Sequence, residues 1–151
     1  MKISLSRLWL LPFLFLTSTA LAAPLTVKHA RVPEGPPVAP VLAGYLVIEN
    51  PGARSVRVTG ASSPLFAAVE IHEMHMKDGM MEMKRLPSLT IPAGGRVELA
   101  PGGLHLMLIK PSRPLRAGDL IPVTLKLDDG SRLELSLPVV ARDDAPSHQP
   151  H

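Results

Sequence analysis

The chain has 151 residues, a length that fits one domain built around a single core. It contains no cysteine, which excludes disulfide bonds, zinc ribbons, thiolate metal sites and cysteine nucleophiles. The formal net charge is only +3, and no basic run interleaved with aromatic residues is present after the first 22 residues, so the composition argues against nucleic acid as a partner.

The first 22 residues predict a secretory signal peptide. Lys2 and Arg7 give a positive start, residues 8–16 are almost wholly apolar, and Ala20-Leu21-Ala22 offers the small residues that a signal peptidase reads. The apolar stretch is shorter than the roughly 20 residues that span a bilayer. We therefore expect cleavage after Ala22, export, and no stable membrane insertion of the mature chain.

The remainder predicts short strands separated by Pro- and Gly-rich breaks. The expected strands are residues 25–31, 43–49, 55–59, 67–74, 81–86, 96–99, 104–109, 121–127 and 132–140. Residues 123–127 and 133–137 alternate apolar and polar side chains, and Asp128-Asp129-Gly130 between them predicts a hairpin turn. The pattern favours an all-β single domain over residues 23–141, an antiparallel sandwich or barrel, followed by a polar, disordered tail over residues 142–151.

Methionine is concentrated in one region. Three of the six histidines lie in the same region, which holds His72, His75, His105, Met74, Met76, Met80, Met81, Met83 and Met107. Thioether sulfur is a soft, neutral ligand, and together with imidazole it suits copper(I) better than zinc, calcium or magnesium. The region therefore predicts a soft-metal site that needs no thiolate.

Strand alternation narrows the candidate ligands. His105 and Met107 share one face of the 104–109 strand, and the leucines at 104, 106 and 108 share the other. His72 faces away from Val69 and Ile71, on the side of Met74. Asp78-Gly79 predicts a turn that lets Met83 lie beside His72 on an adjacent strand. The candidate set is His72, Met83, His105 and Met107.

Neighbouring residues have simpler interpretations. His75 alternates out of phase with His72, so the two rings should face opposite sides of a regular strand. Met76, Met80 and Met81 are either core filler or merely exposed. We interpret the carboxylates Glu70, Glu73, Asp78 and Glu82 as solvated charges, and His148 and His151 as tail residues with weak metal affinity.

The spacing of these residues resembles that of the periplasmic copper chaperone family PCu(A)C. The family pattern is a His, ten residues, a Met, twenty-one residues, then His-x-Met. Ten residues separate His72 from Met83, and twenty-one separate Met83 from His105. The resemblance extends to Gly44-Tyr45-Leu46 and to Gly118-Asp119, and so covers most of the chain from about residue 27 to residue 140.

The resemblance implies a cupredoxin-like or immunoglobulin-like β-barrel that binds copper(I) through His72, Met83, His105 and Met107. It implies a periplasmic metallochaperone without catalysis, whose partners are recipient copper proteins such as a cytochrome oxidase subunit or another copper chaperone. His75, Met76 and the tail leave room for a weaker copper(II) mode.

Other functions remain open. The alternatives are an immunoglobulin-like scaffold module and a copper-tolerance protein that sequesters copper without delivery. An electron carrier is disfavoured, because blue-copper sites require a cysteine thiolate.

Overall fold

The computed structural model describes residues 24–142 as an arrangement of strands, so the predicted signal peptide and all but the first residue of the predicted tail lie outside the described residues. The strands are β1 (Thr26–Pro33), β2 (Val41–Glu49), β3 (Val56–Ser62), β4 (Phe66–Lys77), β5 (Met80–Leu86), β6 (Leu89–Ile91), β7 (Arg96–Leu99), β8 (Leu104–Pro111), β9 (Leu120–Leu127) and β10 (Arg132–Val140). All except β6 were predicted, with ends that differ by at most three residues. Residues 24–142 include no helix with the length and apolar character needed to cross a membrane.

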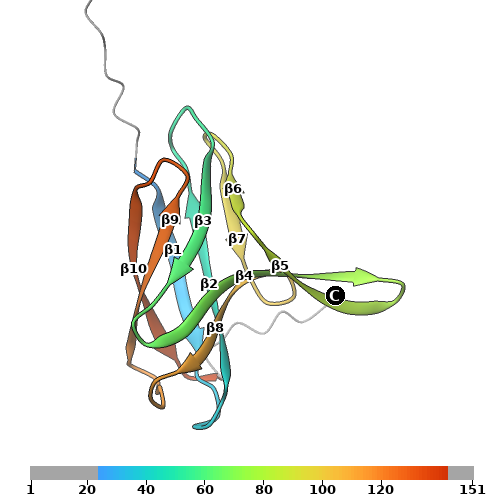
Figure 1. Cartoon of the computed structure of the whole chain (residues 1–151), viewed down its shortest axis with the longest axis vertical. Helices are drawn as coiled ribbons and strands as arrows, with labels where there is room; N and C mark the ends of the chain where they lie inside the picture. The colour runs from blue at the N-terminus through green and yellow to red at the C-terminus, as the bar shows by residue number, and fades with distance from the viewer. Residues whose placement is uncertain (1–23, 143–151) are drawn as a thin grey trace, which may run out of the picture.

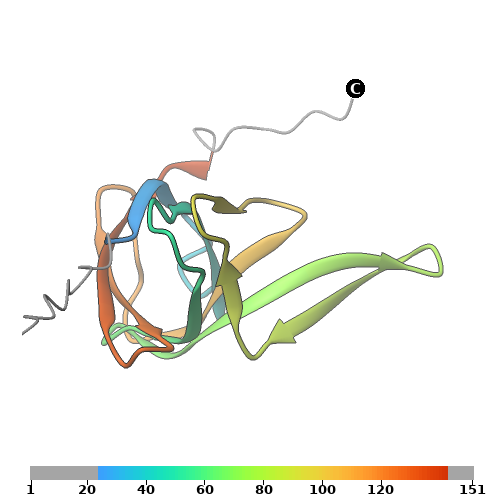
Figure 2. The same ribbon diagram turned by 90° about the horizontal axis from the view of Figure 1, so that it is seen from above.

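The strands close into a barrel. Its wall follows the order β4-β8-β2-β1-β10-β9-β3, and a β3–β4 pairing, with Ala61 opposite Val69, completes the ring. β1 and β10 run parallel, whereas the other neighbouring strands of the ring are antiparallel. β5, β6 and β7 are added outside the ring, on β4, β3 and β2. The predicted all-β single-domain barrel is confirmed (Figures 1 and 2).

Aliphatic side chains fill the barrel. Buried and less buried residues alternate along β2 and β9, as the pleat of a strand with one face in the core requires. On β8, Leu106 and Leu108 are almost completely inaccessible to solvent. Since successive side chains point to opposite faces, burial of these leucines turns His105 and Met107 toward the outside of the barrel.

The hairpin formed by β4 and β5 leaves the barrel and projects from it (Figures 1 and 2). β4 pairs with β8 only from Phe66 to Glu73, but it pairs with β5 as far as Lys77. Asp78 (φ 50°) and Gly79 (φ 78°) form the turn, and two successive positive φ values are what a type I′ two-residue turn needs. The outer half of the hairpin is thus a two-stranded ribbon with both faces open.

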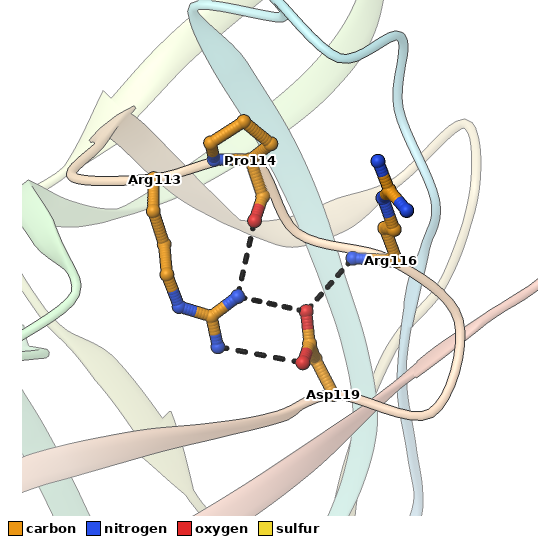
Figure 3. A network of polar contacts seen from close by, with 4 residues as sticks. All are labelled: Arg113, Pro114, Arg116 and Asp119. Atoms are coloured by element: carbon orange, nitrogen blue, oxygen red, sulfur yellow. Dashed lines mark hydrogen bonds and ion pairs between the residues drawn. The ribbon is translucent and has the colours of Figure 1, made fainter.

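A polar network holds the connection between β8 and β9, at the end of β8 away from His105 (Figure 3). The Arg113 guanidinium donates to both Asp119 carboxylate oxygens, at 3.0 and 3.4 Å, and to the Pro114 carbonyl oxygen at 3.0 Å. The Arg116 backbone N–H donates to Asp119 Oδ2 at 2.9 Å. These hydrogen bonds, first of all the one from Arg113, lower the pKa of Asp119 below its ordinary value of 3.8.

Candidate metal centre

Two histidines from facing strands form the middle of the site. His72 of β4 lies directly opposite His105 of β8 in the antiparallel register, and opposed residues in such a pair share a face. The two ring centroids are 5.9 Å apart, with the ring planes inclined at 42°. His105 is 6% exposed, so the pair is largely shielded from solvent although it faces away from the core.

Hydrogen bonds fix which nitrogen of each ring carries a lone pair. His72 Nε2 lies 2.8 Å from Glu70 Oε2, and a carboxylate only accepts, so in the neutral imidazole Nε2 carries the proton and Nδ1 keeps a lone pair that can bind a metal ion. His105 Nδ1 lies 3.2 Å from the Gly103 carbonyl oxygen, which by the same reasoning leaves Nε2 free. Each imidazole therefore offers one nitrogen to a ligand.

His72 Nδ1 is an unusual atom in this structure. It is shielded from solvent and has no hydrogen-bond partner among residues 24–142. A buried polar atom without a partner costs about 1–3 kcal/mol, so such atoms often mark a position that a ligand completes. A metal ion bound at Nδ1 would remove that cost, and this fits the predicted role of His72.

The two candidate methionines lie on the same face as the histidine pair. Met107 follows His105 by two residues on β8 and lies opposite Glu70, which is two residues before His72. Met83 lies on β5 directly opposite Met74, so it is a diagonal neighbour of His72 and not its direct partner, which is Arg85. Diagonal neighbours on a sheet face have Cα atoms about 7–8 Å apart, within reach of a long side chain.

The structure thus brings His72 and His105 into direct opposition and places Met83 and Met107 on either side of them, on β5 and β8. The predicted turn was expected to place Met83 beside His72, but in the observed register Met83 lies directly opposite Met74. The ligand role of the four candidates stays a prediction. All four lie on one outward face, as alternation predicted for His105 with Met107.

Glu70 is the residue of this site that sequence reasoning missed. The interpretation as a solvated charge is wrong for it, since its side chain is only 24% exposed and accepts the hydrogen bond from His72. Its other carboxylate oxygen, Oε1, lies 3.4 Å from Nε of Arg85, which offsets its charge. The available signal was the Glu-x-His spacing, because residues two apart on a strand share a face.

His75 faces away from His72, as predicted, and of the two interpretations of Met76, Met80 and Met81 the exposed one is correct. His75 is on the opposite face of the hairpin, where its Nε2 lies 3.5 Å from Glu82 Oε2. Met76, Met80 and Met81 are exposed, by 66%, 67% and 51%. Within residues 24–142 no three His, Asp or Glu side chains gather closely enough to hold a metal ion.

The fold is a β-barrel of the PCuAC type. The apo PCuAC domain of PmoF2 superposes with a TM-score of 0.67 at 21% identity, covering 84% of this chain and 98% of that one. The copper(I) form of DR1885 from Deinococcus radiodurans superposes with a TM-score of 0.64 at 33% identity, covering 84% of each chain.

A family model described as "Putative lipoprotein LpqE-like" matches residues 25–139, and the chain belongs to this family. "Putative lipoprotein Lxx21020" of Leifsonia xyli subsp. xyli (strain CTCB07) is 40% identical over 93 residues, which are 61% of this chain and 56% of the relative. "Uncharacterized protein RP573" of Rickettsia prowazekii (strain Madrid E) is 28% identical over 89 residues, 58% of this chain and 49% of the relative. The matches span about half the length of these relatives.

Proposed function

We propose that this chain is a copper(I) metallochaperone of the cell envelope, which holds one ion through His72, Met83, His105 and Met107. The observation that carries the proposal is the opposed His72–His105 pair, with one free nitrogen on each ring and a thioether on either side of it. The solved copper(I) form of DR1885, 33% identical, supports copper(I) as the ion.

The donor set favours this ion chemically. Two imidazoles and two thioethers are neutral, so the bound ion keeps its single positive charge, and soft sulfur ligands prefer copper(I) to zinc or magnesium. Thioethers have no proton to lose on binding, unlike thiolates. An outward-facing centre made of such ligands suits an ion that is handed on by exchange of one ligand at a time, and no catalytic step is required.

Export and delivery complete the proposal. The predicted signal peptide and the family's description as a lipoprotein support an envelope location, in the periplasm. The recipient would be a protein that builds a copper centre, such as a cytochrome oxidase subunit or another copper chaperone. Loss of oxidase activity at limiting copper in a strain without this protein would support delivery, whereas loss of copper tolerance alone would favour sequestration.

Binding is tested by copper(I) titration of the mature protein against a chromogenic chelator, under reducing and anaerobic conditions. We expect tight binding that is lost in His105→Ala and strongly weakened in Met83→Leu and Met107→Leu. Met80→Leu is the control, because Met80 is also an exposed methionine of the hairpin but lies opposite Lys77, on the face away from His72. Unchanged affinity in a folded H105A variant would rule the proposal out.

The register makes Met74 a necessary comparison. Met74→Leu should weaken binding less than Met83→Leu if Met83 is the ligand. The reverse order would assign the ligand position to Met74, which lies opposite Met83 on the same face. Unfolding curves of all variants show whether any loss reflects folding instead of binding.

A further inference from the structure

The outer half of the β4–β5 hairpin carries methionines that the four-ligand centre does not use. Met76 lies directly opposite Met81, and Met74 lies opposite Met83, one pair closer to the barrel. Opposed residues share a face, and so do residues two apart on one strand. These methionines therefore continue the face that carries His72, outward along the ribbon.

The two faces of this ribbon differ in chemistry. The face away from the histidine pair carries Glu73, His75, Lys77, Met80, Glu82 and Lys84, which are mostly charged or ionisable. The other face carries only thioethers beyond His72 and Arg85. A methionine that fills a core is buried, whereas Met76 and Met81 are more than half exposed. Packing within this domain does not explain their placement.

The geometry lets three thioethers converge on one ion. Opposed residues on a sheet have Cβ atoms about 4.5–5.5 Å apart, and methionine has three rotatable side-chain bonds with which to turn its sulfur inward. Met74 is diagonal to Met81 and two residues from Met76, so a point above the ribbon is within reach of all three side chains. Arg85, the cation on this face, lies at the barrel end of the row, opposite His72.

We propose that Met74, Met76 and Met81 form a second, weaker copper(I) site on the projecting hairpin, which exchanges its ion with the centre at His72 and His105. Met83 lies between the two sites, opposite Met74 and diagonal to His72. The exchange step and the choice of ion rest on the proposed function. The hairpin site itself rests on the register and exposure of its methionines.

The experiment combines two variants with a control. Met76→Leu with Met81→Leu removes the hairpin site and keeps apolar side chains of similar volume at exposed positions, so folding should be unaffected. His105→Ala with Met107→Leu removes the inner centre. Met80→Leu changes an exposed methionine on the other face of the same ribbon. Copper(I) stoichiometry is measured against a chelator, and methionine methyl NMR signals are followed with silver(I) as a redox-inert probe.

We expect wild type and M80L to bind two equivalents, and M76L/M81L to bind one. H105A/M107L should keep one weaker equivalent that shifts the Met76 and Met81 methyl signals. M76L/M81L should also release its copper to the chelator more slowly, because an intermediate site has been removed.

The inference is overturned if wild type and M76L/M81L bind the same single equivalent and the Met76 and Met81 methyl signals do not move. That result would leave the inner centre, and with it the proposed function, intact. If instead wild type lacks the tight equivalent, the proposed function fails. The hairpin site is then tested by H105A/M107L alone: one retained equivalent supports it, and none overturns it. Should H105A/M107L not fold, the comparison of wild type with M76L/M81L still decides it.

Discussion

The carboxylate of Glu70 should control copper(I) affinity although it is not a proposed ligand. It accepts the Nε2 hydrogen bond of His72 at 2.8 Å, which fixes the tautomer and orients Nδ1. In metal sites, removal of a partner that orients a histidine typically costs 10–100-fold in affinity. Replacement by alanine frees the ring to rotate and removes a negative charge near the ion.

The structure places the effect toward the lower limit of that range. The Glu70 side chain is 24% exposed, and its second partner, Arg85, is 69% exposed, so water screens part of the interaction. We expect Glu70→Ala to weaken copper(I) binding about tenfold, equivalent to about 1.4 kcal/mol. Glu70→Gln keeps a hydrogen-bond acceptor without the charge, and its loss should fall between wild type and E70A.

The assay is a competitive copper(I) titration, accompanied by thermal unfolding to confirm the fold. Glu82→Ala is the matched control, because Glu82 lies 3.5 Å from His75, on the opposite face of the β4–β5 hairpin. E82A should bind copper(I) as wild type does. The reasoning is refuted if folded E70A keeps full affinity, or if E82A loses as much as E70A.

Three further predictions concern the barrel. Leu108→Ala should destabilise the fold by about 2–5 kcal/mol in chemical denaturation, since the leucine is fully buried and a cavity would remain. Asn50→Ala should lower the free energy of unfolding by about 2–3 kcal/mol in the same assay. The buried Asn50 amide donates to the Arg54 and Ile91 carbonyl oxygens and accepts from Gly52 N–H, and the substitution leaves these groups without that partner. A change below about 0.5 kcal/mol would contradict this reasoning. The folded-state pKa of Asp119 is lowered, so its contribution to stability is complete above the ordinary value of 3.8 and is lost as the pH falls below it. Asp119→Asn should therefore flatten that part of the curve of unfolding free energy against pH. An unchanged curve would argue against the Arg113–Asp119 network.

Local pattern sufficed for much of this protein. Pro- and Gly-rich breaks, with side-chain alternation in some segments, located nine of the ten strands, and Asp78-Gly79 and Asp128-Asp129-Gly130 marked two hairpin turns. Alternation also placed His105 with Met107, and turned His72 away from Val69 and Ile71. β6 was not predicted, because the three residues between Pro87-Ser88 and Pro92 are too few to establish a period.

Which residues oppose one another was decided by the tertiary structure. A shift of two residues between β4 and β5 would leave each side chain on its face, so alternation cannot distinguish Met83 opposite Met74 from Met83 opposite His72. The same holds for the parallel β1–β10 pairing. Periodicity of two determines the face of a residue, whereas register and contact depend on the partner strand, which local sequence does not specify.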